Sequence, residues 1–286
     1  MATLVSPAGD LEKLKYSVLY GADSVYLAGK DYGLRNRAGN FALGEMEEGI
    51  RFAHGHSCKV DVAINISARD EDIPKMLQAA SEAKEAGADG VIVADAGLVS
   101  LLHEKMPRLH LTLSTQANAL NRHALKFWKG AGVDRVVLAR ELSFEELREL
   151  SKHRPEGLEL EAFVHGAMCI SYSGRCLISS YLAGRDSNRG DCAQPCRWSY
   201  ALMEEKRPGE YFPVAEDGQS TLFFNSCDLC LIRRIPDLME IGIDAFKIEG
   251  RMKSAYYAAA VTNAYRIAME RAANATYSWD DLAAEL

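Results

Sequence analysis

Short apolar runs recur along the chain, and several of them follow a helical pattern that ends in a glycine. Four of these segments read YGADSVYLAG (20–29), AGADGVIVAD (86–95), AGVDRVVLAR (131–140) and IGIDAFKIEG (241–250). The glycines suit the left-handed cap that ends many helices, and they are Gly21, Gly87, Gly132 and Gly242. Nearly continuous apolar runs are typical of parallel strands covered on both faces. The pattern therefore predicts alternating helices and strands.

Counting all such runs gives eight predicted strands, at 3–6, 24–28, 59–65, 90–94, 110–114, 135–139, 158–164 and 245–249. Between them lie apolar side chains at helical spacing, such as Leu11, Leu14 and Val18. Eight strands that alternate with helices predict an α/β fold of the (β/α)8 or TIM-barrel type. An open doubly wound sheet is the alternative, but no GxGxxG follows the first strand.

One long segment interrupts this rhythm after the seventh strand. We expect residues 1–165 to hold the first seven strands, and residues 166–226 to form a cysteine-rich insertion with a small hairpin at 200–203 and 221–224. Residues 227–286 then supply the last helix, strand and helix, with the seventh helix at 227–239. In a barrel such an insertion lies on the carboxyl face of the strands, where active sites are built.

Six of the seven cysteines lie between 169 and 230. Disulfides are disfavoured, because the start MATLVSPAGD has no secretory signal and the cysteine count is odd. Buried structural thiols are disfavoured too, because Gly, Ser, Arg, Asn, Asp and Pro surround these cysteines. A metal site is the better interpretation. The spacing C-x6-C-x15-C-x3-C leaves zinc and an iron–sulfur cluster both open.

Composition narrows the function classes. The chain has 286 residues, of which 48% are hydrophobic and 26% charged, as in ordinary globular domains. No apolar run approaches the ~20 residues that span a bilayer. The net charge of −7 excludes a basic footprint over the whole surface, although a local patch for nucleic acid remains open. We expect a cytoplasmic protein.

Polar residues stand where the predicted strands end, and a barrel would gather them around one mouth. They are Asn65, Asp95, Gln116, Arg140, Glu141, His165, Glu249 and Arg251. Asp95 and Asn121 are equally well explained as helix caps. A capping role fits Glu161 and His165 less well, because they lie in or at the end of an apolar strand.

The segment EAFVHGAMCISYSGRCLIS resembles the signature of the collagenase-like U32 peptidase family. The resemblance extends over nearly the whole chain, through SPAGDLEKLKYSVLYGADSVYLAG, LRNRAGNF, LSTQANALNRHALKFW, RVVLAREL, NRGDCAQPCRW and FKIEGRMKSAYYAAAV. Some members of that family are described as collagen-degrading proteases. Others hydroxylate a tRNA uridine or an rRNA cytidine, and relatives hydroxylate ubiquinone precursors without oxygen.

For this chain the resemblance implies a [4Fe–4S] cluster held by Cys169, Cys176, Cys192 and Cys196. It also implies prephenate as hydroxyl donor or cofactor, and tRNA, rRNA or a small aromatic molecule as substrate. A second family member is the expected partner if the protein works as a heterodimer. Many relatives continue into a further β-rich domain, so specificity here is expected to come from the barrel or a partner. The motif NSCDLC departs from the family pattern, and Cys227 or Cys230 could replace one of the four ligands.

These considerations give a set of predicted site residues. The catalytic candidates are Glu161, His165, Arg140 and Glu141. The substrate-binding candidates are Arg35, Arg37, Asn65, Gln116, Glu249, Arg251 and Lys253. The arginines and the lysine are expected to bind an anionic group, and Tyr172, Phe41 and Trp198 are candidates for stacking on a base.

A peptidase is the alternative function, and hydroxylation of a quinone precursor is a further one. The sequence has no GxSxG and no HExxH, so only a pair of Cys169 and His165 could supply a nucleophile and a base. A barrel that serves only as a scaffold is a third interpretation, and the density of polar residues at strand ends argues against it.

Overall fold

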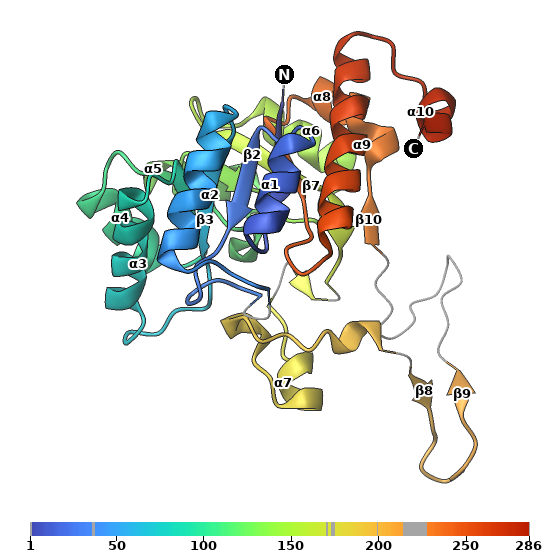
Figure 1. Ribbon diagram of the computed structural model, residues 1–286. Helices are drawn as coiled ribbons and strands as arrows, with labels where there is room; N and C mark the ends of the chain where they lie inside the picture. Colours follow the sequence, from blue (N-terminus) through green and yellow to red (C-terminus); the bar gives the residue numbers. More distant parts are fainter. Residues whose placement is uncertain are drawn as a thin grey trace.

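The predicted barrel is confirmed in the computed structural model, which describes residues 2–35, 38–169, 171–172, 175–198, 200–213 and 228–285. Eight parallel strands follow one another in sequence order, and the pairings β6–β7, β7–β11 and β11–β1 close the ring (Figure 1). They are β1 (Thr3–Pro7), β2 (Ser24–Leu27), β3 (Lys59–Ile64), β4 (Gly90–Val93), β5 (His110–Leu113), β6 (Arg135–Val137), β7 (Glu159–Ala167) and β11 (Ala245–Ile248).

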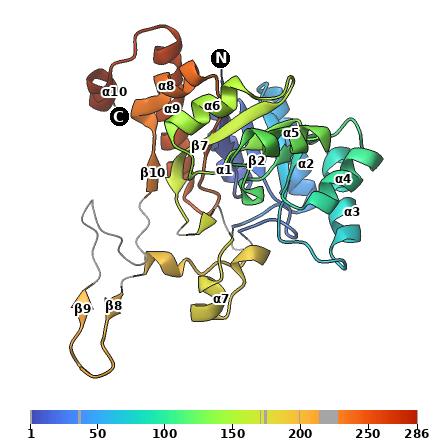
Figure 2. The same cartoon turned by 180° about the vertical axis from the view of Figure 1, so that it is seen from behind.

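Helices cover the outside of the barrel (Figures 1 and 2). They are α1 (Leu11–Leu19), α2 (Leu43–Gly55), α3 (Ile73–Glu85), α4 (Ala96–Lys105), α5 (Arg122–Gly130), α6 (Phe144–Lys152), α8 (Ile235–Ile241) and α9 (Ala255–Ala273), followed by α10 (Trp279–Glu285). Asp95 and Asn121 cap helices, accepting hydrogen bonds from the backbone N–H of Leu98 (2.9 Å) and Ala124 (3.0 Å). The four glycines of the repeat have φ between 84° and 101°, as a left-handed cap requires.

The hydrophobic core has two parts. The larger part fills the space between the strands and the surrounding helices. The smaller part lies inside the ring and consists of Val5, Tyr26, Ala28, Ala63, Ile92 and Ala245. Because barrel interiors are usually filled by bulky branched side chains, Ala28 and Ala63 leave space near the carboxyl ends of β2 and β3.

The cysteine-rich insertion leaves the barrel after β7 and lies below it in Figure 1. It contains the short helix α7 (Ile178–Ala183) and a hairpin of β8 (Ala201–Leu202) and β9 (Phe212–Pro213). The hairpin prediction was right for its first strand. The described partner strand, however, is 212–213, which the sequence analysis did not assign to the hairpin, and 221–224 lie outside the described residues.

The prediction of a helix from 227 to 239 was wrong at its start. Residues Asp228–Cys230 form β10, which runs antiparallel to the end of β7, and α8 begins only at Ile235. β7 is longer than its neighbours, so its last backbone groups need partners beyond the parallel barrel, and β10 supplies them. Pro236 then occupies the first turn of α8, where its missing N–H costs nothing.

An ion pair ties the insertion to the barrel. Arg189 donates to both carboxylate oxygens of Asp72, at 2.7 and 3.1 Å, just before α3 begins. Asp72 also accepts a hydrogen bond from the backbone N–H of Arg69 (2.9 Å). The hydrogen bonds from Arg189 lower the pKa of Asp72 from 3.8 to about 2.

Replacing Asp72 with asparagine is expected to lower the free energy of unfolding at pH 7 by about 1.5–3 kcal/mol, the range for hydrogen bonds to charged groups. Because the folded pKa lies below the unfolded one, the carboxylate contributes fully above about pH 4, and its contribution is lost as the pH falls through about 2. Urea unfolding of wild type and variant over this pH range measures the difference. Equal stabilities at pH 7 would contradict the prediction.

Candidate active site

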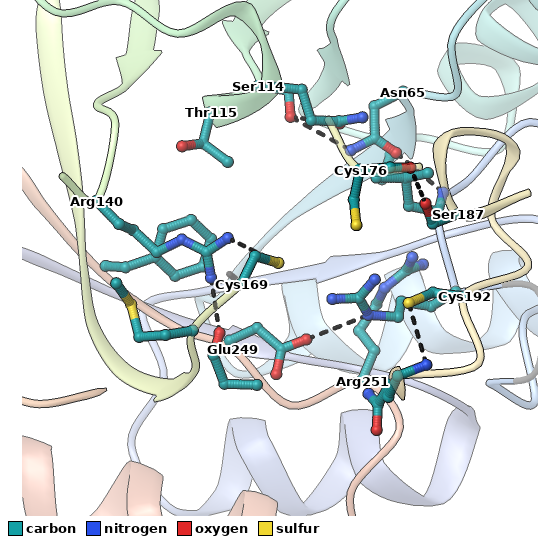
Figure 3. Close-up of a pocket in the computed structure, with 18 of the residues that line it drawn as sticks. Asn65, Ser114, Thr115, Arg140, Cys169, Cys176, Ser187, Cys192, Glu249 and Arg251 are labelled. Atoms are coloured by element: carbon teal, nitrogen blue, oxygen red, sulfur yellow. Dashed lines mark hydrogen bonds and ion pairs between the residues drawn. The ribbon is translucent and has the colours of Figure 1, made fainter. Parts of the chain in front are cut away.

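A pocket of about 130 Å³ opens at the carboxyl ends of the strands, where the insertion faces the barrel (Figure 3). Its floor includes Tyr26, Ala63, Ile92 and Val137, which come from four different strands. Its opposite wall comes from the insertion. The volume is close to the ~150 Å³ of cavities that hold one benzene ring, so the pocket has the size of a single ring.

All four cysteines predicted as metal ligands line this pocket, and we call Cys169, Cys176, Cys192 and Cys196 the pocket cysteines. Each is partly buried. Figure 3 shows the side chains of the first three directed into the same space from different sides. Within the described part of the chain, no three His, Cys, Asp or Glu side chains converge closely enough to hold a single metal ion.

Polar groups already point at two of these sulfurs. The guanidinium of Arg140 lies 3.5 Å from Cys169 Sγ, and the backbone N–H of Gln194 lies 3.3 Å from Cys192 Sγ. Hydrogen bonds to thiolate sulfurs are a common feature of iron–sulfur sites. Four thiols around one pocket, with donors directed at two of the sulfurs, fit a metal cluster better than a dry core.

Side-chain hydrogen bonds fix the loop that carries Cys176. Asn188 accepts from the backbone N–H of Cys176 and donates to its carbonyl, both at 3.1 Å, and Ser187 donates to the same carbonyl at 2.6 Å. A few residues on, Ser179 accepts from the backbone N–H of Ala193 (2.9 Å), next to Cys192. These short-range contacts hold the thiols in place without regular secondary structure.

Five cationic side chains line the same pocket: Arg35, Arg140, Arg197, Lys247 and Arg251. Arg251 is 4% exposed, and its Nη1 has no hydrogen-bond partner among the described residues. Burial lowers the pKa of Arg251 to about 10. A buried donor without a partner is costly, and the side chain that carries it lines the pocket. Arg251 is therefore suited to bind an anionic group of a ligand.

Arg35 reaches the pocket from the loop after β2. Its Nε lies 3.5 Å from Glu249 Oε1, and its φ of 77° is rare for a residue with a side chain. Tyr32 and Asn40 in the same loop also have positive φ. Strained backbone of this kind is concentrated at functional sites, and here it surrounds a pocket-lining arginine.

Uncharged polar groups form the remaining side. Ser114 donates to Gln116 Oε1 (2.9 Å) and accepts from Asn65 Nδ2 (3.4 Å). Asn65 Oδ1 in turn accepts from the backbone N–H of Leu34 (3.1 Å). Amide side chains held in this way can pair with the edge of a nucleobase.

The structure therefore brings together many of the predicted site residues. In addition to the pocket cysteines, those that line the pocket are Arg35, Asn65, Gln116, Arg140, Glu249 and Arg251. Arg37 and Cys227 lie outside the described residues. Cys230 lies in β10 opposite His165, is exposed, and is not among the described residues that line the pocket.

His165 was predicted to lie at the mouth and Glu161 to be catalytic, but neither is among the described residues that line the pocket. A β-bulge in β7 pairs Phe163 with Lys247 but His165 with Ile248, and bulges redirect side chains. His165 consequently packs against Tyr257 and Tyr265 of α9, and burial lowers its pKa. Glu161 lies beneath the pocket, 1% exposed.

The other predicted residues that lie away from the pocket are at the surface or in the core. Glu141 is exposed in the turn after β6. Lys253 forms an ion pair with Asp228 at 3.5 Å. Of the proposed stacking residues, Phe41 is buried in the main core, while Tyr172 and Trp198 are exposed. Outside the pocket, these side chains belong to the surface or the core.

The residues that line the pocket but were not predicted from the sequence include Lys247, Tyr26, Ser114 and Phe163. A signal for Lys247 was present. In the strand AFKIEG, residues 245, 247 and 249 share one face, and a charged residue at the middle of an otherwise apolar strand marks an inward position.

Comparison with known proteins agrees with this architecture. The model of peptidase family U32 matches residues 9–286. The chain belongs to this family. Among its relatives, the tRNA hydroxylation protein P1 of Bacillus subtilis is 44% identical over 263 residues, which cover 92% of this chain and 62% of that protein. This U32 chain thus spans about three fifths of the length of that relative.

Two further U32 relatives differ in their described activities. The tRNA hydroxylation protein P of Escherichia coli is 37% identical over 309 residues, covering 94% of this chain and 68% of the relative. A collagenase of Porphyromonas gingivalis is 31% identical over 294 residues, which cover 97% of this chain and 69% of that protein.

The solved structure of the U32 peptidase Mk0906 has the same fold. It superposes with a TM-score of 0.57 at 16% identity, covering 87% of this chain and 93% of that one. In the described part of this U32 chain, no helix is both long and apolar enough to cross a membrane.

Proposed function

We propose that this U32 protein is an iron–sulfur-dependent enzyme that hydroxylates a base of RNA, most directly a tRNA uridine, with prephenate as hydroxyl donor. The single observation that carries the proposal is the pocket itself, in which four cysteines face a ring-sized space lined by cations. The relatives named tRNA hydroxylation proteins, at 44% and 37% identity, support the choice of RNA.

The pocket cysteines are the proposed ligands of a [4Fe–4S] cluster. Tetrahedral zinc sites have Zn–S bonds of about 2.3 Å and need closely converging thiolates. Thiols that share a pocket without converging on one point fit a larger group better. When bound, such a cluster supplies electron transfer or a Lewis-acidic iron.

The protein side chains have separate tasks in this proposal. Arg251 and Arg35 bind the anionic groups of the donor molecule, since arginine suits carboxylates. Asn65 and Gln116 contact the edge of the base, because Ser114 already fixes both amides. Arg140 donates to Cys169 and to the carbonyl of Ala167 (2.7 Å), and so holds the start of the insertion against the barrel.

Peptide hydrolysis is the competing function, because one relative is named a collagenase. It has less support from the site. Cys169 lines the pocket beside Arg140, whereas His165 packs against the tyrosines of α9. The two members of the cysteine–histidine pair suggested by the sequence thus lie in different surroundings, one at the pocket and one against α9.

The proposal is tested by expressing the chain in a bacterium that lacks its own U32 hydroxylation proteins. Nucleosides from purified tRNA and rRNA are then analysed by mass spectrometry. We expect a uridine heavier by one oxygen atom in tRNA with wild type, and none with Cys176→Ala. An iron-loaded wild-type protein that modifies neither RNA, yet cleaves gelatin, would favour the peptidase.

A further inference from the structure

A row of four charged side chains crosses the inside of the barrel below the pocket. Lys247 Nζ lies 2.6 Å from Glu161 Oε1, and Arg135 donates to Glu161 Oε2 at 3.3 Å. Arg135 Nη1 also lies 4.0 Å from Asp61 Oδ2. All four side chains are buried. Buried ion pairs add little net stability, because desolvation offsets their attraction, so a function is the better reason for their presence.

Among these four charged side chains, Lys247 is the one that lines the pocket. It lines the pocket wall together with Tyr26, whose ring centroid lies 4.3 Å from the ammonium nitrogen. An ammonium group has three N–H donors. Glu161 accepts a hydrogen bond from one of them, and the face of the Tyr26 ring attracts the positive charge without occupying an N–H donor. Donor capacity therefore remains toward the cavity.

Glu161 has a different position. It is 1% exposed and is not among the described residues that line the pocket. Its two oxygens are both engaged, one by Lys247 and one by Arg135. A carboxylate in this place fixes the direction of the lysine and balances its charge, but it does not touch a ligand.

We propose that Lys247 binds the carboxylate of a small, ring-sized organic acid at the pocket floor, and that Glu161 is a positioning residue that acts through Lys247. The proposal rests on the proposed function in one respect, namely that this pocket is the reaction site. Lys247 was not predicted as a site residue from the sequence, and Glu161 has a positioning role in place of the predicted catalytic one.

A double-mutant cycle separates this role from a structural one. The variants are Lys247→Met, Glu161→Gln and the two combined, and each is compared with wild type for melting temperature, iron content and affinity for benzoate by titration calorimetry. Lys247→Met alone leaves Glu161 without its lysine and is expected to melt earlier. The double variant replaces both charges and is expected to regain wild-type stability and iron.

The benzoate affinities then distinguish a ligand-binding role of Lys247 from a purely structural one. We expect benzoate affinity to fall at least tenfold in the double variant despite its restored stability, and Lys247→Arg to retain part of the affinity. In the hydroxylation assay, the same double variant should show a raised KM for prephenate. Unchanged benzoate affinity in a stable double variant would overturn the proposal, and so would a wild type that does not bind benzoate.

The calorimetry does not depend on catalysis. If iron-loaded wild type hydroxylates no RNA, the proposed function fails, while the benzoate affinities still test Lys247. If hydroxylation is found but the double variant binds benzoate as wild type does, only the assignment of Lys247 fails.

Discussion

Alanine at any one of the pocket cysteines is expected to reduce bound iron from about four atoms per chain to a small fraction, and to abolish hydroxylation. The physical reason is that a [4Fe–4S] cluster is held by four cysteine thiolates, and no other described cysteine lines the pocket to replace a lost one. Anaerobic purification, iron and sulfide analysis and the absorption spectrum near 400 nm measure this directly.

Two cysteines outside the pocket serve as controls for this series. Cys58 is buried in the main core, and burial raises the pKa of its thiol to about 12, so it stays protonated. Cys230 is exposed in β10. Alanine at either position is expected to leave the iron content unchanged. Loss of iron in Cys230→Ala, or full iron in Cys192→Ala, would show that the ligand set differs from the one proposed.

Arg251→Met is expected to weaken prephenate binding strongly while making the folded protein more stable. The guanidinium is buried and its Nη1 is unpaired in the described structure. Removing such a donor should recover about 1–3 kcal/mol of desolvation cost. Losing a buried charged contact with the ligand costs about 2–5 kcal/mol, which corresponds to an increase in KM of at least about 30-fold.

The opposite signs of these two effects make the test specific. Arg154 is a suitable control, because it pairs with Asp244 at the other end of the barrel. Arg154→Met should lower stability and leave KM unchanged. The measurements are thermal unfolding and the dependence of hydroxylation rate on prephenate concentration. An Arg251→Met variant with lower stability and unchanged KM would mean that the side chain is structural.

Much of the fold could be predicted from the sequence because its determinants are local. The glycine caps and the continuous apolar strands repeat along the chain, and each unit is recognisable within about ten residues. All eight predicted strands were found within a few residues of their predicted limits. The four pocket cysteines were likewise recognisable from the sequence, and the structure places all of them at one pocket.

What the sequence could not determine depends on contacts between distant segments. The bulge in β7 arises in its pairing with β11, and it turns His165 from the mouth toward α9. The strand β10 forms because the extended end of β7 needs partners for its backbone. Neither the bulge nor the pairing of β10 can be recognised from the local sequence pattern.

Glu161 illustrates, in a single residue, the difference between what the sequence determines and what the tertiary structure determines. The sequence alone determined that a carboxylate lies in an apolar strand, and hence that it has an unusual role. Only the tertiary structure decided which role, because Lys247 and Arg135 come from β11 and β6, strands that meet β7 when the barrel closes. Sequence patterns determine which face of a strand is buried, whereas closure of the ring determines which charges meet inside it.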